Sequence, residues 1–348
     1  MKTMLKALTL ALCACLLLCL FTGCAGETGA STARTGDATS STRPDTAGKE
    51  LSVVATIFPA FDWTRQLIGA DNDRVALTLL LDRGTDLHSY QPTVEDIYKI
   101  STCDLFIYVG GESDKWVPDA LAQATNKNMK VICLLDVLGS AVKEEELVEG
   151  MEGEHEHDDN DDDHEEEESP EYDEHVWLSL RYAQTLCAAI RDGLIAVDSA
   201  GETAYTANCA AYTDKLAALD AAFSETVASA QRKTLLFADR FPFRYLVDDY
   251  ALTYYAAFVG CSAETEASFE TVNFLVGKVD ELELPYILKL ESSDGRLADT
   301  VVSNSKTKSA QILELNSLQS VTAEGVAEGV TYLGVMEHNL EVLKTALG

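Results

Sequence analysis

A run of acidic residues and histidines from Glu152 to Glu168 constrains this chain more than any other feature. It has no apolar face to bury and a large self-repelling charge, so it does not fold alone. At His175 the character changes, because Val176 and Trp177 follow at once and indicate entry into packed structure. Imidazole and carboxylate together suit zinc and related ions. We therefore predict that His175 is a metal ligand held by a rigid framework.

Short β-branched apolar segments alternate with helical segments on both sides of this run. This alternation predicts an α/β fold with mostly parallel sheets covered by helices. A segment from Thr203 to Ala230 contains no Gly or Pro and repeats apolar residues at three- and four-residue steps, which predicts one long helix. The 348 residues exceed what one core usually organises, so we expect two lobes joined by this rigid helix. The strands are expected at 51–58, 75–81, 105–109, 131–135, 234–238, 253–258, 286–290 and 310–315.

The N-terminus has the pattern of an export signal. Lys2 and Lys6 precede an apolar run that is too short for a membrane span and closes at Cys24. Small residues before a Cys are similar to the lipobox of bacterial lipoproteins, so we expect residues 1–24 to be a signal peptide and Cys24 to be lipidated. An ordinary secretory signal is the alternative. Residues 25–50 are rich in Gly, Ser, Thr and Ala and predict a flexible tether.

Charge and cysteine content narrow the classes of partner. A net charge of −32 argues against binding nucleic acid or an anionic membrane surface through a basic face, and it favours cations. Five cysteines remain after the signal, without a CxxC spacing, so they do not form a disulfide framework. We interpret most of them as small buried apolar residues: Cys103, Cys133, Cys187, Cys209 and Cys261.

A second candidate ligand is His88, in the loop from Asp86 to Thr93. The loop follows an expected strand and precedes an expected helix, which is where open α/β sheets present ligands. Asp96 stands three residues after Thr93, the spacing of a capping box, so the helix is expected to begin there. A loop histidine without a ligand is the alternative interpretation.

Several motifs then stand in one order along the chain: Thr56-Ile57-Phe58-Pro59, the His88 loop, Asp104 to Gly110, and Glu174 to Leu178. Together they resemble the zinc- and manganese-binding solute-binding lipoproteins of metal ABC transporters, the ZnuA-like family. The resemblance implies a Zn(II) site, or Mn(II), in a cleft between two lobes, with His88 and His175 as ligands. It also implies a monomeric extracytoplasmic receptor, anchored to the bacterial membrane through lipidated Cys24, that delivers the ion to an ABC permease. The expected divisions are a first lobe at 51–202, a connecting helix at 203–231 and a second lobe at 232–348.

The second lobe departs from the family pattern at two positions. Arg240 falls where the resemblance implies a third ligand, and a guanidinium has no free lone pair. Asn316 occupies the place of a late Asp. We therefore expect an oxygen ligand from the neighbouring Asp239, with Glu266 and Glu291 as further candidates because each follows an expected strand.

The acidic loop at 143–173 is expected to capture metal weakly through His155, His157 and His164; a solvated loop without a role is the alternative. His338, in the last helix, is interpreted as a solvated surface residue. Two other functions remain open: a zinc hydrolase with an open water position, and a sensor or adhesin whose second-lobe site has drifted. The chain contains no HExxH and no nucleophile elbow, so we expect a binding protein and not an enzyme.

Overall fold

The computed structural model describes residues 50–70, 72–152, 171–262 and 266–348. The expected signal peptide, nearly all of the tether and Cys24 lie outside the described residues. So do the three loop histidines, His155, His157 and His164.

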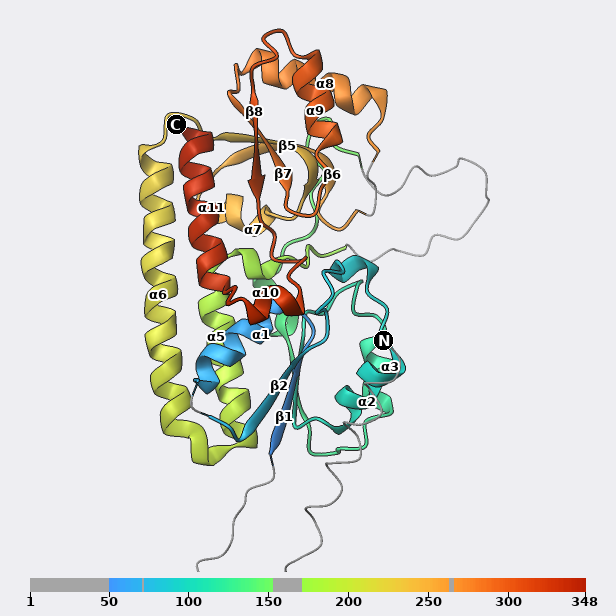
Figure 1. The fold of residues 1–348 in the computed structure, drawn as a ribbon, viewed down its shortest axis with the longest axis vertical. Helices are drawn as coiled ribbons and strands as arrows, with labels where there is room; N and C mark the ends of the chain where they lie inside the picture. The colour runs from blue at the N-terminus through green and yellow to red at the C-terminus, as the bar shows by residue number, and fades with distance from the viewer. Residues whose placement is uncertain (1–49, 71, 153–170, 263–265) are drawn as a thin grey trace, which may run out of the picture. The chain divides into compact units, whose positions relative to one another are not determined.

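The first lobe is built on a parallel four-stranded sheet in the order β2-β1-β3-β4 (Figure 1). Its central strand β1 carries Val53 and Val54, which are fully buried. Strand order reverses between β1 and β3, and loops at the carboxyl ends of such strands are the usual ligand sites. The elements are β1 (Leu51–Ala55), α1 (Phe58–Ile68), β2 (Val75–Leu79), η1 (Leu87–Ser89), α2 (Val94–Thr102), β3 (Leu105–Tyr108), α3 (Val117–Ala122), β4 (Lys130–Cys133), α4 (Leu134–Leu138), η2 (Gly139–Ala141), η3 (Val176–Leu178), α5 (Leu180–Val197) and η4 (Ser199–Gly201).

The second lobe repeats this plan with a parallel sheet in the order β6-β5-β7-β8. Leu236 and Ala238 of β5 pack into one core with side chains of α8 and α9, whereas Phe237 and Phe241 face the other side and join the core shared with the first lobe. The elements are β5 (Thr234–Phe241), α7 (Arg244–Asp249), β6 (Thr253–Val259), α8 (Phe269–Glu281), β7 (Tyr286–Leu290), α9 (Arg296–Asn304), β8 (Gln311–Leu315), α10 (Ala323–Ala327) and α11 (Tyr332–Leu347).

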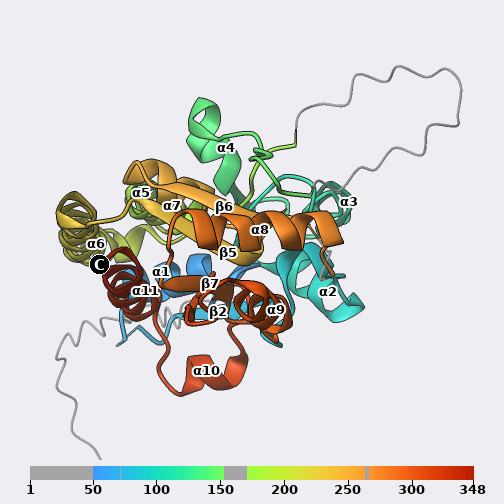
Figure 2. The same ribbon diagram turned by 90° about the horizontal axis from the view of Figure 1, so that it is seen from above.

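The long helix α6 spans Glu202–Ser229, 28 residues, and runs beside both lobes (Figure 1). It contacts α5 and α1 of the first lobe, and α11 lies against it along the second lobe (Figure 2). One buried apolar cluster continues from Val53 through Phe223 to Leu347. A large apolar contact between two lobes opposes their relative motion. This shared core therefore keeps the edges of the two sheets in a fixed position relative to each other.

Local sequence signals explain several element boundaries. Thr93 and Asp96 form the expected capping box, with each side chain accepting from the other residue's backbone N–H. The first strand was expected at 51–58 but ends at Ala55, and Pro59 stands in the first turn of α1, where its missing N–H costs nothing. Helices α10 and α11 are separate because Gly329 lies between them at φ +96°.

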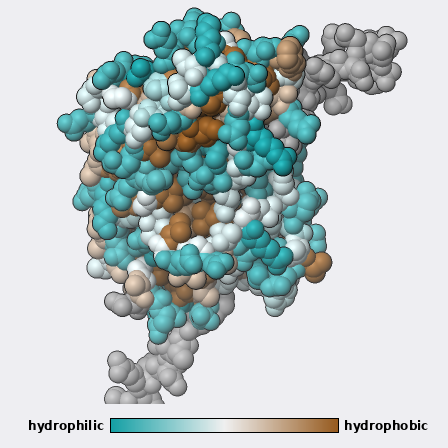
Figure 3. Space-filling model, turned by 45° about the horizontal axis from the view of Figure 1, so that its top comes forward, coloured by the Kyte–Doolittle hydropathy of each residue, from teal (hydrophilic) through white to brown (hydrophobic). Residues whose placement is uncertain are grey.

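Figure 3 shows a face on which hydrophilic residues predominate, interrupted by patches of apolar ones. Within the described residues, no helix combines the length and apolar character that a membrane crossing needs.

Candidate metal site

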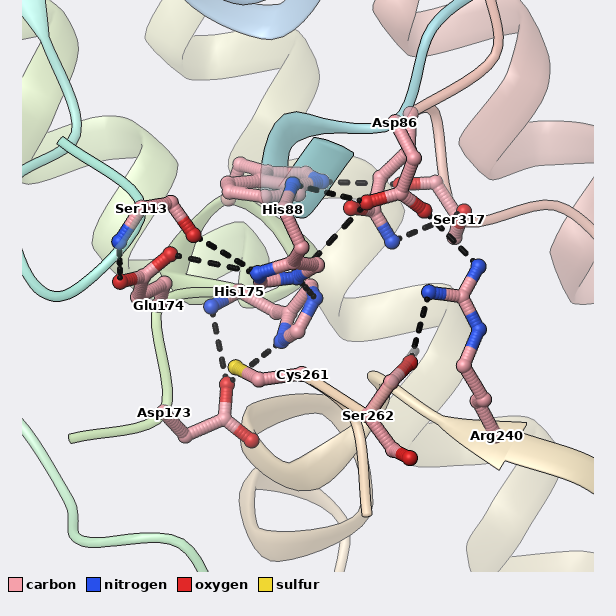
Figure 4. Close-up of polar contacts among 12 residues, drawn as sticks. Asp86, His88, Ser113, Asp173, Glu174, His175, Arg240, Cys261, Ser262 and Ser317 are labelled. Carbon is pink, nitrogen blue, oxygen red and sulfur yellow. Dashed lines mark hydrogen bonds and ion pairs between the residues drawn. The ribbon is translucent and has the colours of Figure 1, made fainter. Parts of the chain in front are cut away.

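His88 is positioned by a short turn that follows β2. Asp86 caps the helix η1, because its Oδ1 accepts from the His88 backbone N–H at 3.0 Å. The ring is fixed from its other side, where Nδ1 lies 2.7 Å from the Ser113 hydroxyl. These contacts leave Nε2 of His88 directed away from its own loop (Figure 4).

His175 stands at the point where the chain re-enters packed structure, directly before η3. It is fully buried, and Asp173 Oδ1 accepts both from its backbone N–H at 2.8 Å and from its ring Nδ1 at 2.9 Å. The Trp177 ring lies edge-on to the imidazole, with centroids 5.2 Å apart. A carboxylate on Nδ1 fixes the ring orientation and makes Nε2 more basic, as in carboxylate–histidine–zinc arrangements.

The two imidazoles face each other through their Nε2 atoms, which are 3.1 Å apart (Figure 4). Two nitrogens bound tetrahedrally to one zinc ion, at about 2.0–2.1 Å each, lie about 3.3 Å from one another. The pair therefore has nearly the spacing that a shared metal ion requires. The two nitrogens lie within hydrogen-bond distance of each other, and protons compete with a metal for them.

Cys261 is the third residue of this cluster. In the described part of the chain, His88, His175 and Cys261 form a group whose ligand atoms all lie within 4.8 Å of one another. The preceding residue permits this approach, because a Cβ on Gly260 would lie 2.9 Å from the Phe241 carbonyl oxygen and 3.0 Å from His175 Cε1. The Cys261 backbone N–H donates to Glu145 Oε1 at 3.1 Å, which fixes the segment.

Carboxylates give the site a negative surrounding that suits a cation. Glu174 is buried, its Oε1 accepts from the Ser113 N–H at 2.8 Å, and its Oε2 lies 3.6 Å from His88 Nδ1. Its approach depends on Gly111, at φ +83°, since a Cβ there would lie 2.4 Å from Glu174 Oε1. A side chain at position 111 would therefore displace the carboxylate from the histidines.

Protonation differs among these groups for physical reasons. Burial lowers the pKa of His88 to about 3, and the neighbouring His175 adds to this. Burial also acts against charge on His175, but the Asp173 carboxylate outweighs it, so the pKa of His175 is raised. Burial raises the pKa of Glu174 to about 7 and that of the Cys261 thiol well above its usual range.

Arg240 does not take a ligand's place but forms an ion pair. Its Nη2 donates to Asp86 Oδ2 at 2.8 Å, and its Nη1 donates to the Ser262 carbonyl at 3.1 Å. The carboxylate that Arg240 binds belongs to the first lobe. Burial raises the pKa of Asp86, but Arg240 and His88 outweigh it and the net pKa is lowered.

The structure does not bring the three expected second-lobe acids to the histidine pair. Asp239 is held within its own lobe, where its Oδ2 accepts from the Leu290 N–H at 3.0 Å and its Oδ1 from the Arg240 N–H at 2.9 Å. Glu266 is exposed, and with Asp239 it lines a separate cavity of about 610 Å³ that includes neither His88 nor His175.

Glu291 braces a loop instead of facing the site. Its carboxylate accepts from the Ser317 N–H at 2.8 Å and from the Ser317 and Ser320 hydroxyls at 2.9 Å each. The Ser317 carbonyl in turn accepts from the Trp177 indole at 2.9 Å, so Glu291 supports the His175 segment indirectly. The amide oxygen of Asn316 is engaged by the Leu318 N–H at 2.8 Å, which explains why it offers no metal ligand.

Sequence reasoning missed Cys261 and Asp86 as members of the site. Both had a usable signal. Cys261 directly follows an expected strand of the second lobe, and Asp86 begins the loop that carries His88. Because the five cysteines were interpreted together as buried apolar residues, the position of Cys261 at a sheet edge was overlooked.

Comparison with known proteins agrees with this architecture. Residues 53–346 match the family model of ZnuA, the zinc-uptake complex component A, periplasmic. The chain is 34% identical over 302 residues to the zinc-binding lipoprotein AdcA of Streptococcus pneumoniae, covering 86% of this chain and 56% of that protein. It is 32% identical over 303 residues to the high-affinity zinc uptake system protein ZnuA of Bacillus subtilis, covering 87% and 89%. The crystal structure of the Zn(II)-bound ZnuA-like domain of S. pneumoniae AdcA superimposes with a TM-score of 0.65 at 30% identity, covering 86% and 99%.

The fold, two α/β lobes with a long helix beside them, is that of the ZnuA-like solute-binding proteins. The chain belongs to the ZnuA family of zinc-uptake components. It spans about half the length of the streptococcal relatives.

Proposed function

We propose that this protein is an extracytoplasmic receptor that binds Zn(II) as cargo and delivers it to an ABC permease for uptake. The observation that carries the proposal is the 3.1 Å approach of His88 Nε2 and His175 Nε2, each ring held from behind. Membership of the zinc-uptake family supports the same function, and so do relatives named for zinc binding.

Each residue of the pair has a defined task in capture. Asp173 holds the His175 ring so that its Nε2 faces the cargo, and the Asp86 cap with Ser113 does the same for His88. Protons compete with the ion for the imidazole nitrogens, so zinc affinity falls as the pH drops through the histidine range.

The site favours binding over catalysis. We propose a receptor and not a hydrolase, because the chain belongs to a family of zinc-uptake components and relatives are named for zinc binding and uptake. Anchoring through lipidated Cys24, a monomeric state and the lobe boundaries at 51–202, 203–231 and 232–348 belong to the same proposal. So does weak capture of metal by His155, His157 and His164.

Zinc titration calorimetry tests the proposal with three variants. His88→Ala and His175→Ala should each lose tight binding of one zinc ion. His338→Ala is the matched control, because His338 is an exposed residue of α11, and it should bind like the parent. Unchanged tight binding in either of the first two variants would contradict the proposed site.

Delivery is tested in cells of the source bacterium. Loss of the gene should slow growth when zinc is chelated, and the parent gene should restore it. The His175→Ala gene should not. Full restoration by this variant would separate the protein's role from zinc capture and favour a sensor or adhesin.

A further inference from the structure

The second lobe lacks the metal donors that the family resemblance implies for it. Arg240 stands at one of those positions and is bound to Asp86, and the Asn316 amide oxygen is bound to the Leu318 N–H. Asp239 is occupied by the backbone of Leu290 and by its own neighbour. Two histidines of the first lobe alone would leave half of a tetrahedral ion uncovered.

Cys261 is the second-lobe residue that reaches the pair. It belongs to the segment directly after β6, and its sulfur lies within 4.8 Å of the His88 and His175 ligand nitrogens (Figure 4). In a tetrahedral zinc site with Zn–S at about 2.3 Å, sulfur and nitrogen lie about 3.6 Å apart. A closing movement of about 1 Å is therefore enough to complete the contact.

The surrounding contacts hold this segment close to the imidazole ring. Gly260 has no side chain where a Cβ would meet His175, and Glu145 binds the Cys261 N–H at 3.1 Å. The other cysteines differ. Cys103, Cys187 and Cys209 are buried in the apolar core, and none of them, nor Cys133, joins a metal-ligand group in the described residues.

We propose that Cys261 supplies a thiolate ligand to the metal cargo, as the second-lobe ligand that Arg240 does not provide. The proposal rests on the proposed function, because it names a further ligand of the same site. When the ion binds, the S–H bond breaks, sulfur donates its electron pair to the metal, and the proton leaves to solvent.

A thiolate changes which ions the receptor accepts. Thiolate is a soft ligand that favours zinc, and with it cadmium and cobalt, over manganese, which prefers oxygen donors. The receptor should therefore bind zinc more tightly than manganese because of Cys261. Removing the sulfur should reduce the ratio of zinc affinity to manganese affinity.

Cobalt(II) is the probe that reports the ligand directly. A thiolate bound to Co(II) gives a charge-transfer absorption in the near ultraviolet, which imidazole and carboxylate do not give. The full chain should show this band at one cobalt per protein. Cys261→Ala should lose the band, and Cys261→Ser should lose it also. Cys133→Ala, which removes a half-buried thiol outside the cluster, should keep it.

The outcomes separate this inference from the proposed function. Stoichiometric cobalt binding that depends on His88 and His175 but lacks the band would overturn the thiolate and leave the receptor intact. Failure of the parent to bind cobalt or zinc would overturn both. A band that survives in Cys261→Ala would assign the sulfur to another cysteine and overturn the inference.

Affinity gives a second readout that a change in packing would not reproduce. Cys261→Ser should weaken zinc binding by at least about 100-fold. Residues that only support a metal ligand already change metal affinity by about 10- to 100-fold when they are mutated, and a ligand itself should change it by at least as much. Manganese binding should change by much less. Its metal-free melting temperature should match the parent's, so loss of affinity is not loss of the fold. Equal weakening for zinc and manganese would contradict a thiolate ligand.

Discussion

The guanidinium of Arg240 donates to the carboxylate of Asp86 at 2.8 Å, and this pair joins β5 of the second lobe to the His88 loop of the first. Both side chains are mostly buried, with 16% and 20% of their surfaces exposed. The pair therefore links the two lobes beside the histidines. It also places a fixed positive charge beside the site of a cation.

Arg240→Met should weaken the fold and strengthen zinc binding together. Loss of the partner leaves Asp86 charged and partly buried, so the free energy of unfolding of the metal-free protein should fall by about 1–3 kcal/mol. Zinc affinity should rise about tenfold, because a repelling charge is gone and Asp86 is free to face the ion. Calorimetry and urea unfolding measure the two effects. Arg296→Met removes an exposed charge of the same lobe and serves as control; weaker zinc binding in Arg240→Met would contradict this reasoning.

Asp173→Asn should lower zinc affinity about 10- to 100-fold while keeping one site. The carboxylate holds the His175 ring and its backbone N–H at once, and an amide cannot make the same charged contact. Competition with a chelator of known affinity measures the change. If the variant binds zinc as the parent does, the orientation of His175 does not depend on Asp173.

Asp239→Asn distinguishes the sequence-based ligand set from the one that the structure favours. Asp239 accepts from two backbone N–H groups of its own lobe and is not a member of the histidine cluster. Zinc affinity should therefore change by less than about tenfold, or 1.4 kcal/mol. A loss as large as that of His88→Ala would restore Asp239 as a ligand and require the second lobe to rearrange on binding.

Asp114 should make the metal-free protein less stable as the pH rises from about 4 to 7. Burial raises the pKa of Asp114 to about 6, well above the ordinary value for an aspartate, although the Val109 and Gly110 N–H groups donate to its Oδ2. In this window the folded state holds a proton that the unfolded state has released, so rising pH favours unfolding. Relative to Asp114→Asn, the parent should lose on the order of 2 kcal/mol across the window. Parallel curves of unfolding free energy against pH would contradict the assignment.

Much of the fold could be predicted because its signals are local. Thr93 and Asp96 mark a helix start within four residues, and the uninterrupted segment from Thr203 predicts α6 almost to its ends. Element boundaries were harder to predict. The first strand ends at Ala55 and not at Phe58, because α1 already begins at Phe58 with Pro59 in its first turn, and Gly329 at positive φ separates α10 from α11.

The site was predictable only where a motif carries it. His88 and His175 lie in separate motifs of the first lobe, and the structure brings their Nε2 atoms together. The second-lobe side chains depend on tertiary contacts between distant segments, such as Arg240 with Asp86, 154 residues apart. No local sequence pattern predicts that Asp239 accepts from the Leu290 N–H. Nor does one predict that Gly260 allows the Cys261 segment to approach His175.

Anomalous scattering from a zinc-bound crystal, measured on both sides of the zinc absorption edge, tests the central claim most directly. One strong peak should lie about 2.0–2.1 Å from both His88 Nε2 and His175 Nε2, so that the ion stands between the two nitrogens in place of their hydrogen-bond contact. A tight zinc site on other residues, with the two Nε2 atoms still in contact at 3.1 Å, would contradict the account.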